Sequence, residues 1–365
     1  MDSPLRVLHL DTERGWRGGE QQAMYLMEGL IRRGHKVAAV GRPGCEFAER
    51  SRRKGVAVFE VDTLGELDFL SGLKIGRIAR DFSAQIIHAH TAHTHPLAVV
   101  AARRSGAKCI VSRRVDFPIG KGLFSGLKYR YGVDRYIAIS RAVKDVMTRG
   151  GVAAERIAVV HSGIDPARFD GIVPADHREE FGIARDELVV GNVAALVDHK
   201  GQRYLIDAVP YVLAELPRTR FVIVGEGELR DELVAQAKPY GDRVIFTGFR
   251  TDVGSLMLFF DLFVMSSHME GLCTSLLDAM SLGCPVVATR AGGIPEIVES
   301  GVDGVLVEPR NPKALADAIV ALLRQPEERA RLARAGKDKV AREFTADAMV
   351  EGTVKVYLEV LGIAN

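Results

Sequence analysis

At 365 residues the chain is longer than one ordinary hydrophobic core accommodates, so we expect two domains of roughly 170 to 190 residues each. Its 47 % hydrophobic and 26 % charged residues are typical of a globular protein. No apolar run approaches the ~20 residues of a membrane-spanning helix, so we do not expect an integral membrane protein. The net charge of +2 is unevenly distributed: residues 1–170 carry 28 Lys and Arg against 18 Asp and Glu, and residues 171–365 carry 21 against 29.

Four cysteines are dispersed along the chain without a paired spacing. This distribution is typical of a reducing compartment and argues against both a disulfide framework and a zinc site. The N-terminal residues MDSPLRVLHLD contain a short apolar run and no small-residue cleavage site, so we interpret them as a first strand and not as a signal peptide. We therefore expect a cytoplasmic protein.

The basic excess is concentrated in residues 101–150, which hold 12 Lys and Arg against 3 Asp and Glu. Such a segment attracts phosphate groups or an anionic membrane surface, whereas a solvated basic face is the ordinary alternative. We expect no nucleic-acid partner.

Short β-branched runs alternate with helical patterns through the first half of the chain. This alternation predicts a doubly wound parallel sheet in a first Rossmann-like domain, residues 1–170. A polar stretch with Pro and Gly, residues 170–186, is the predicted linker. The strand-like runs begin at Arg6, Lys36, Val56, Ala84, Lys108 and Arg135.

The alternation restarts after the linker and predicts a second Rossmann-like domain, residues 171–344. The predicted fold class is therefore α/β, and ligands of such paired domains usually bind at the carboxyl ends of the strands. The pattern is helical from Pro312 onward, and we expect the final segment, residues 345–362, to pack back on the first domain. The strand-like runs begin at Leu188, Arg220, Arg243, Leu262, Pro285 and Gly304.

A glycine-rich turn, Arg17-Gly18-Gly19-Glu20, lies between the first predicted strand and a helix that ends near Gly34. It does not have the G-x-G-x-x-G pattern, and no such fingerprint follows any predicted strand, which argues against a nicotinamide cofactor. The alternative to a ligand site is a tight turn without a ligand.

The segment HAHTAHTH places His88, His90, His93 and His95 at the end of a predicted strand. Four imidazoles so close together suggest a metal site. His88 and His90 share a strand face, but the turn after His90 need not bring His93 and His95 back to it. We therefore favour a substrate-facing or acid–base role for one histidine, His90, over metal binding.

Three loops of the second half follow predicted strands. Lys200, before Gly201 at a helix entrance, is placed to meet a phosphate as a point charge, although a surface lysine is the simpler interpretation. The loops that contain Gly225 and Phe249–Arg250 are weaker signals, because an ordinary strand-to-helix turn explains either one.

The segment from Ser266 to Glu299 places an acid, a glycine, a helix start and a second acid within nine residues. A strand over Leu262–Ser267 leads into a loop with Glu270 and Gly271, and a helix begins near Thr274 or Ser275, with Asp278 in its first turn. Such a helix start is a phosphate site, and the two carboxylates are suited to hydroxyls. The pattern favours a nucleotide sugar. A Ser275–Asp278 capping box with a solvated Glu270 is the alternative.

Taken together, these segments resemble the retaining nucleotide-sugar glycosyltransferases of family 4, glycosyl transferases group 1. The resemblance implies the GT-B fold, in which two Rossmann-like domains face a central cleft and bind the acceptor and the donor respectively. It extends along nearly the whole chain, through the motifs RGGEQQ with RRGHKV, IIHAHT, HSGIDPARF, HKG, VGEGELR, FTGF, MEGLCTSLLDAMSLGCPVVAT, and GGIPEIV followed by DGVLVEP.

The family carries a Glu-x7-Glu motif whose first acid contacts the donor sugar and whose second contacts the ribose. By resemblance these are Glu270 and the shorter Asp278, while residues 272–275 supply backbone N–H groups to the diphosphate and Phe249–Arg250 meet the base. The candidate catalytic residues are Glu270 and Lys200, by resemblance, and His90, from its place at the end of a predicted strand. The donor-binding residues implied are Gly18, Gly19, Lys200, Gly225, Phe249, Arg250, Glu270, Gly271, Leu272, Cys273, Thr274, Ser275 and Asp278.

The chain departs from the family pattern around its cations. Family members pair the loop lysine with an arginine five residues earlier, where this chain has Ala195, and we hypothesise that Arg17 or the Arg113–Arg114 pair replaces it. After the fifth strand, where several relatives carry a histidine, this chain has the sequence SRRVDF. The role of that histidine therefore cannot be assigned to a residue of this chain. The acceptor-side candidates are His90, Arg113, Arg114 and Asp116.

The resemblance implies sugar transfer from a nucleoside diphosphate sugar with retention of configuration, without a cofactor or metal. The acceptor hydroxyl attacks from the front face, and the leaving diphosphate accepts its proton. We expect a glycolipid or oligosaccharide acceptor in lipopolysaccharide, surface polysaccharide or glycolipid biosynthesis, and a peripheral position on the inner face of the membrane. The alternatives are a nucleotide-sugar epimerase or phosphorylase of the same fold, and a nucleotide-sugar-binding pseudoenzyme.

Overall fold

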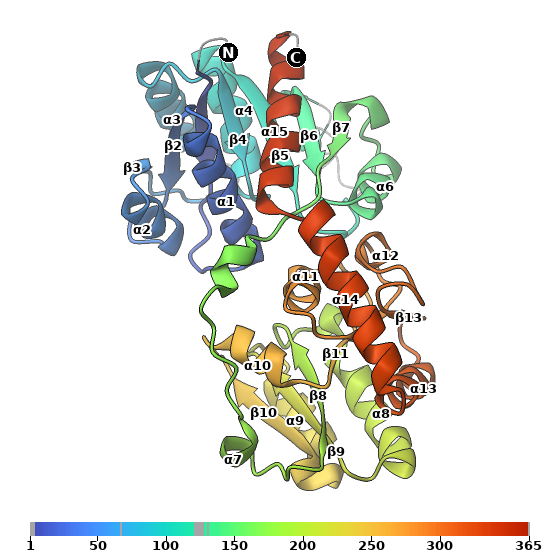
Figure 1. Ribbon diagram of the computed structural model, residues 1–365. Helices are drawn as coiled ribbons and strands as arrows, with labels where there is room; N and C mark the ends of the chain where they lie inside the picture. Colours follow the sequence, from blue (N-terminus) through green and yellow to red (C-terminus); the bar gives the residue numbers. More distant parts are fainter. Residues whose placement is uncertain (1–3, 66–67, 120–127, 130, 364–365) are drawn as a thin grey trace. The chain divides into compact units, whose positions relative to one another are not determined.

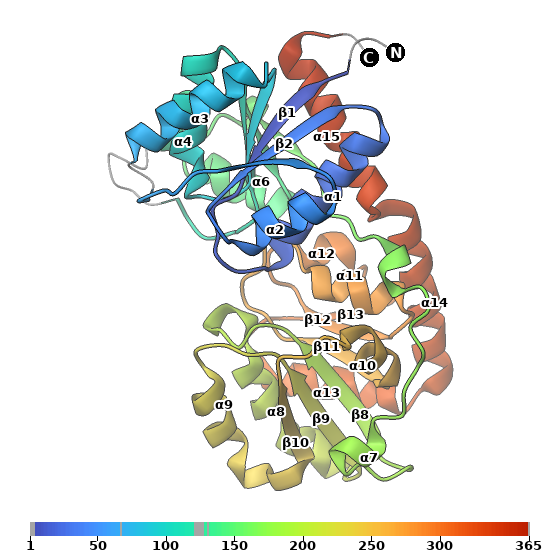
Figure 2. The same ribbon diagram turned by 90° about the vertical axis from the view of Figure 1, so that its left-hand side faces the viewer.

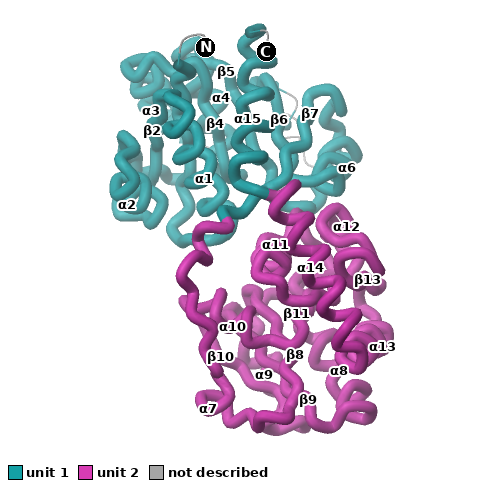
Figure 3. The backbone as a smooth tube through the Cα atoms, in the orientation of Figure 1, with its two compact units in different colours: residues 1–165, 345–365 teal, residues 166–344 magenta. Residues whose placement is uncertain are grey.

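The computed structural model describes residues 4–65, 68–119, 128–129 and 131–363. The chain forms two compact units, coloured separately in Figure 3. Unit 1 comprises Met1–Asp165 together with Thr345–Asn365, and unit 2 comprises Pro166–Phe344. Each unit is described by itself below.

Unit 1 is built on a parallel sheet of seven strands in the order β3-β2-β1-β4-β5-β6-β7 (Figure 1). The strand order reverses between β1 and β4, which pair in register so that His9 lies opposite His88. The loops after these two strands therefore diverge at the carboxyl edge of the sheet, where parallel α/β sheets bind ligands. The strands are β1 (Arg6–Leu10), β2 (Lys36–Gly41), β3 (Ala57–Glu60), β4 (Ile86–Ala89), β5 (Lys108–Arg113), β6 (Arg135–Ala138) and β7 (Ile157–Val159).

Helices cover both faces of the unit 1 sheet, as Figure 2 shows. On one face, α1 (Gly18–Arg32), α2 (Glu46–Arg53) and α15 (Ala346–Leu361) bury apolar side chains against alternate residues of the central strands. On the other side, α3 (Phe69–Asp81) packs against α4 (Thr94–Ser105). Further helical segments of unit 1 include α6 (Arg141–Arg149) and the short turn η1 (Ala154–Arg156).

The C-terminal helix α15 belongs to unit 1, although it follows the whole of unit 2 in the chain. The chain re-enters through a bridge between Ile164 and Thr345, and the Ala346 N–H donates to the Ile164 carbonyl at 2.7 Å. Helix α15 then packs on α1, where Val350 faces Gly29 so closely that a side chain at position 29 would collide with it. Tyr357 is fully buried in the same core.

Unit 2 contains a second parallel sheet, of six strands in the order β10-β9-β8-β11-β12-β13. Its order reverses between β8 and β11, so the loops after these strands flank the switch point. Strand β11 ends at Met265, two residues before the end that the sequence pattern predicts. The strands are β8 (Leu188–Val193), β9 (Thr219–Val224), β10 (Val244–Gly248), β11 (Leu262–Met265), β12 (Val286–Thr289) and β13 (Val305–Val307).

The main core of unit 2 lies between this sheet and a layer that includes α8 (Gln202–Glu215), α9 (Arg230–Ala237) and α13 (Pro312–Leu323). The longest helix, α14 (Pro326–Glu343), packs against both α11 and α13. The other helical segments are η2 (Pro166–Phe169), α7 (Arg178–Phe181), η3 (Asp198–Lys200), η4 (Lys238–Arg243), α10 (Val253–Phe259), α11 (Thr274–Ser281) and α12 (Ile294–Ile297).

The predicted fold class is confirmed: each unit carries a doubly wound, wholly parallel sheet with helices on its faces. Across the described parts of the chain, no helix combines the length and the apolar character that crossing a bilayer requires.

Candidate functional site

The switch point of unit 2 brings together a cation and an anion that lie 70 residues apart in the chain. Lys200 ends η3 after β8, Glu270 lies in the loop after β11, and the Lys200 Nζ donates to Glu270 Oε2 at 2.7 Å. The side chains are 20 % and 9 % exposed, so the pair is well shielded from water. Ser267 also donates to the same carboxylate oxygen, at 3.2 Å. The sequence predicts both residues as site residues but not their contact.

Backbone hydrogen bonds fix the two loops to each other. The His199 carbonyl accepts the His268 N–H at 2.9 Å, and the Ser266 hydroxyl donates to the Lys200 carbonyl at 3.3 Å. The Glu270 carbonyl accepts the N–H of Gly293, from the loop after β12. Lys200 and Glu270 are therefore positioned by several elements of unit 2 before any ligand binds.

Helix α11 starts four residues after Glu270, at Thr274, with Cys273 as its N-cap. The first N–H groups of a helix have no intrahelical acceptors, and its dipole favours an anion there. Gly271, Leu272 and Cys273, which lead into this helix start, are buried. The Ser275–Asp278 capping box is wrong, because the helix begins before Ser275 and Asp278 lies in the second turn, not the first.

Asp278 pairs with a residue that the sequence analysis missed. Arg168, in η2, directs its Nη1 to both carboxylate oxygens of Asp278, at 3.2 and 3.3 Å. Burial raises the pKa of the Asp278 carboxyl to about 6, and the nearby Arg168 opposes that rise. The only sequence signal for this pair is the HSGIDPARF motif that contains Arg168.

Two glycines let the backbone pack tightly at the carboxyl edge of the unit 2 sheet. At Gly225, after β9, φ is 138°, and a side chain would overlap the carbonyl oxygen of Ala194. At Gly201, φ is 66°, and a side chain would overlap the Ser266 carbonyl. Both positions therefore require glycine. Ala195 is exposed beside them and contributes no charge.

The loop after β10 presents Phe249, whose side chain is 70 % exposed, next to Arg250. The Arg250 guanidinium is held by Asp252, at 2.6 and 2.8 Å, and by Glu180. These hydrogen bonds raise the Arg250 pKa above its usual range. Arg250 is thus a fixed cation beside an exposed aromatic ring.

In unit 1 the predicted glycine turn opens α1 at Gly18, with Arg17 as the N-cap and Glu20 accepting the Arg17 N–H at 2.6 Å. Asp11, directly after β1, was not predicted as a site residue. It is fully buried, and its Oδ2 has no hydrogen-bond partner among the residues that the structure describes. Burial, reinforced by the charge of Glu20, raises the Asp11 pKa to about 8.

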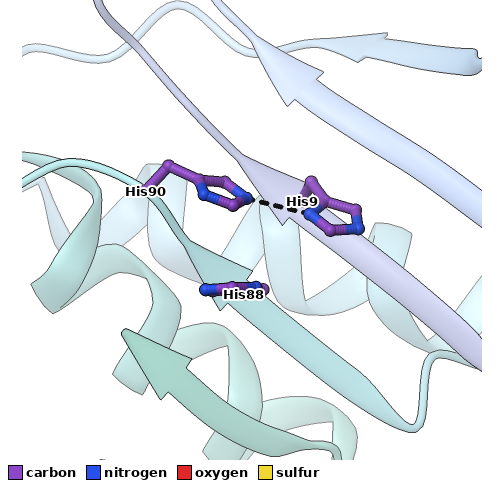
Figure 4. A group of neighbouring side chains, drawn as sticks. All are labelled: His9, His88 and His90. Carbon is purple, nitrogen blue, oxygen red and sulfur yellow. Dashed lines mark hydrogen bonds between the residues drawn. The ribbon is translucent and has the colours of Figure 1, made fainter. Parts of the chain in front are cut away.

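Three histidines gather on the face of the unit 1 sheet that α1 and α15 cover (Figure 4). His9 Nδ1 lies 2.9 Å from His90 Nε2, while His88 Nδ1 and Nε2 contact the hydroxyls of Tyr357 at 2.6 Å and Ser112 at 2.8 Å. Burial lowers the pKa of His9 to about 3 and holds those of His88 and His90 well below the usual range. All three rings are therefore neutral at pH 7.

Neutral imidazoles are the form that binds metal ions, and one nitrogen from each of the three rings lies within 4.8 Å of the others. Both nitrogens of His88 are already hydrogen-bonded, however, and His9 and His90 are bonded to each other. A metal ion would have to displace these contacts, so we interpret the cluster as a buried hydrogen-bonded network. His9 Nε2 and His90 Nδ1 have no partner in it.

His93 and His95 do not join this cluster. His93 is exposed near Glu13, whereas His95 is buried against the rings of Tyr129 and Tyr136. Among the described residues, the histidines that lie together are His9, His88 and His90.

The acceptor-side candidates after β5 have different environments. The Arg113 guanidinium donates to the Tyr129 hydroxyl at 2.6 Å and to the Phe117 carbonyl, so it holds its own segment together. Arg114 lies against Gly19, and burial lowers its pKa to about 10. Asp116 is partly exposed.

Comparison with known proteins places these features in context. Residues 174–339 match the family model of "Glycosyl transferases group 1", and residues 16–168 match that of "Glycosyltransferase Family 4". LpsE, a lipopolysaccharide core biosynthesis glycosyltransferase of Rhizobium meliloti, is 28 % identical over 352 residues, 94 % of this chain and 95 % of LpsE.

A second relative is the UDP-Gal:alpha-D-GlcNAc-diphosphoundecaprenol alpha-1,3-galactosyltransferase of Escherichia coli. It is 26 % identical over 270 residues, which cover 69 % of this chain and 70 % of that enzyme. Among solved structures, Anabaena HepE in complex with UDP-glucose matches with a TM-score of 0.83 and 24 % identity, over 97 % of this chain and 100 % of HepE. At this identity the structural likeness shows the fold.

Proposed function

Because the chain belongs to the group 1, family 4 glycosyltransferases, we propose that it transfers a sugar from a nucleoside diphosphate sugar to an acceptor hydroxyl with retention of configuration. The observation that carries this proposal is the Lys200–Glu270 pair at the switch point of unit 2, beside the start of α11. A cation, a carboxylate and a helix N-terminus together suit a phosphate joined to a polyhydroxylated sugar.

In this proposal, unit 2 binds the donor. Lys200 and the first N–H groups of α11, from residues 272–275, meet the diphosphate, and Glu270 accepts hydrogen bonds from the sugar hydroxyls. Asp278 lies near the ribose, and Phe249 stacks on the base beside the fixed Arg250. Gly225 and Gly271 allow the backbone to approach the ligand closely.

The proposed reaction needs no metal. The bond between the anomeric carbon and the leaving diphosphate breaks, the acceptor oxygen bonds to the same face of that carbon, and the acceptor proton passes to a diphosphate oxygen. Lys200 and the α11 terminus stabilise the charge that develops on the diphosphate.

On the acceptor side we propose the carboxyl edge of the unit 1 sheet. The neutral His90 has an Nδ1 without a hydrogen-bond partner among the described residues, and we propose that this nitrogen meets an acceptor hydroxyl. Arg114 lies against Gly19 at the start of α1, and Asp116 follows in the loop after β5. Gly18 and Gly19 themselves stay donor-binding candidates. Arg113 acts by holding that loop.

The relatives support a polymer or lipid acceptor. LpsE is named for lipopolysaccharide core biosynthesis, and the Escherichia coli enzyme acts on a diphosphoundecaprenol-linked sugar. We propose an acceptor of this class, met at the inner face of the membrane, where the basic residues of the 101–150 segment attract anionic lipid.

The test begins with the purified full chain and a thermal-shift screen of UDP, GDP, ADP and their sugars. The bound donor is then incubated with glycolipid and oligosaccharide acceptors in EDTA, and the anomer of the product is read by NMR. Glu270→Gln should lower transfer by at least about 100-fold, because it removes a charged hydrogen-bond acceptor beside the reacting sugar. The matched control is Glu215→Gln, which breaks the exposed pair with Arg324 elsewhere in unit 2.

An inverted anomer would refute retention, and loss of activity in EDTA would refute metal independence. Unchanged turnover in Glu270→Gln would refute the site. Turnover of the nucleotide sugar without any acceptor would instead identify an epimerase or a phosphorylase, and binding without turnover would identify a pseudoenzyme.

A further inference from the structure

Arg168 carries a positive charge close to the proposed donor site, yet it uses little of its hydrogen-bonding capacity. Of its five N–H donors, only Nη1 contacts a partner among the described residues, and that partner is Asp278. The Arg168 side chain is 39 % exposed, whereas that of Asp278 is 11 % exposed. The carboxylate therefore holds one edge of the guanidinium and leaves the other edge accessible.

The segment that carries Arg168 is fixed in unit 2. The Arg168 guanidinium lies over the Phe169 ring, 4.6 Å from its centroid. Phe169 and Ile172 pack on Gly254 of α10 so closely that a side chain at position 254 would collide with both. The Ala175 N–H donates to the Ser255 hydroxyl on the same helix. Arg168 thus has a fixed backbone and a fixed guanidinium edge.

The pair lies near the start of α11. Asp278 is four residues after Thr274, the first residue of the helix, which is about one turn or 6 Å along its axis. The Cys273 thiol, at the N-cap, interacts electrostatically with Glu270 and Lys200 and also with Asp278. The two ion pairs, Lys200–Glu270 and Arg168–Asp278, therefore both lie close to the helix start.

The negative charge of a nucleoside diphosphate would not be balanced by Lys200 alone. A nucleoside diphosphate brings at least two negative charges, and the charge of Lys200 is already offset by Glu270 at 2.7 Å. Asp278 occupies only Nη1 of Arg168, so Nε and Nη2 keep their donors without a partner among the described residues. A guanidinium with free donors in a planar fork matches the geometry of phosphate oxygens.

We propose that Arg168 is the second cation of the diphosphate site, and that Asp278 is the positioning residue that orients it. This inference rests on the proposed function, because it assigns a residue to the donor of that reaction. Arg168 binds the diphosphate through Nε and Nη2 while Nη1 stays on Asp278. Binding then requires no movement of η2, which carries Arg168.

The experiment compares the affinities of the full chain for a nucleoside, its monophosphate and its diphosphate, with the base chosen from the screen above. Wild type and the variants Arg168→Ala, Arg168→Gln and Arg168→Lys are titrated by calorimetry. Arg168→Ala should weaken diphosphate binding by about 10- to 100-fold and nucleoside binding by less than about 3-fold, because only the phosphate contacts are lost. Arg168→Lys should recover part of the diphosphate affinity, whereas Arg168→Gln should not.

Arg324→Ala is the matched control, since it removes an arginine from an exposed ion pair of unit 2 with Glu215 at 2.8 Å. If Arg168 only anchors η2 to α11, its variants will lower the melting temperature and weaken the binding of all three ligands equally, which overturns the inference. An unchanged preference for the diphosphate in Arg168→Gln also overturns it, and this conservative variant covers the case in which Arg168→Ala does not fold. A wild-type chain that binds no nucleoside diphosphate refutes the proposed function itself, so the two failures are distinguishable.

Discussion

Replacement of Asp278 by asparagine should make the protein more stable at pH 8 and leave its stability unchanged at pH 4. The Asp278 carboxyl is buried on α11, and burial raises its pKa from the ordinary value of 3.8 to about 6. Asparagine has nearly the same shape, keeps an oxygen that accepts the Arg168 hydrogen bond, and never becomes charged. The substitution therefore isolates the cost of the buried charge.

The magnitude follows from the displacement of the pKa. Each pH unit corresponds to about 1.4 kcal/mol, so the rise to about 6 is worth about 3 kcal/mol. Between pH 3.8 and 6 the folded protein holds a proton that the unfolded chain has released, so the stability that Asp278 contributes is lost as the pH rises through this window. Above pH 6 the variant should exceed the wild type by about 3 kcal/mol.

The assay is urea unfolding of wild type and Asp278→Asn at pH 4, 6 and 8, followed through the transition of unit 2. Asp252→Asn is a control of opposite sign. The hydrogen bonds from Arg250 hold the Asp252 pKa below its usual value, so this substitution should destabilise the protein at pH 8 and lose its effect as the solution is acidified through that lowered pKa.

A single result would refute the reasoning about Asp278. If Asp278→Asn is less stable than the wild type at pH 8, the attraction to Arg168 outweighs the desolvation of the carboxylate. The Asp278 pKa would then lie below 3.8, and the charge balance drawn for the donor site would be wrong.

Further substitutions test other parts of the structure. Gly225→Ala should lower the free energy of unfolding by about 3 kcal/mol, and with it the melting temperature, because φ is 138° and the new side chain would meet a carbonyl oxygen. Gly241→Ala, where φ is also positive but the space around the new side chain is open, should destabilise the protein much less. Tyr357→Phe should cost about 1 to 3 kcal/mol in urea unfolding, since it leaves His88 Nδ1 without its hydroxyl partner. Asp11→Asn should flatten the decrease in wild-type melting temperature between pH 4 and pH 8, because the Asp11 pKa is raised to about 8.

Each of these has a contrary outcome. Equal losses for the two glycine variants would mean that backbone strain alone, and not the collision at position 225, sets the cost. An unchanged unfolding curve for Tyr357→Phe would mean that the hydroxyl is not a net contributor. A pH profile of Asp11→Asn that parallels the wild type would mean that Asp11 is ionised in the folded protein at neutral pH.

Local patterns in the sequence were sufficient for the architecture. The β-branched run at Leu262 and the helical pattern after it predict β11 and α11 because a strand and a helix bury side chains with different periods. The residue at which α11 begins was not predictable in the same way. The N-cap is Cys273, whose side chain makes no capping hydrogen bond. The hydroxyls of Thr274 and Ser275, the usual signal of an N-cap, therefore placed the N-cap one or two residues too late.

Contacts between segments that are distant in the chain could not be predicted from the sequence. Glu270 and Lys200 were both predicted as site residues, but only the strand order, with β11 beside β8, brings their side chains to 2.7 Å. His9 went unnoticed because it is a single histidine in an apolar strand, and its neighbours His88 and His90 are 79 and 81 residues away. Arg168 likewise could not be recognised as a site residue from the sequence, because its contact with Asp278 exists only in the folded chain.

The placement of α15 has a consequence for how the protein is made. The core of unit 1 includes Val350 and Tyr357, which leave the ribosome after all of unit 2. The core of unit 1 therefore stays incomplete, with apolar surface of α1 uncovered, while residues 166–344 are synthesised. At typical rates this synthesis takes about 10 to 40 s. Unit 2, whose strands and helices are contiguous, can complete its fold first. A chain cut short before Thr345 would carry a finished second unit and an unfinished first one, and so would be a natural target for chaperones.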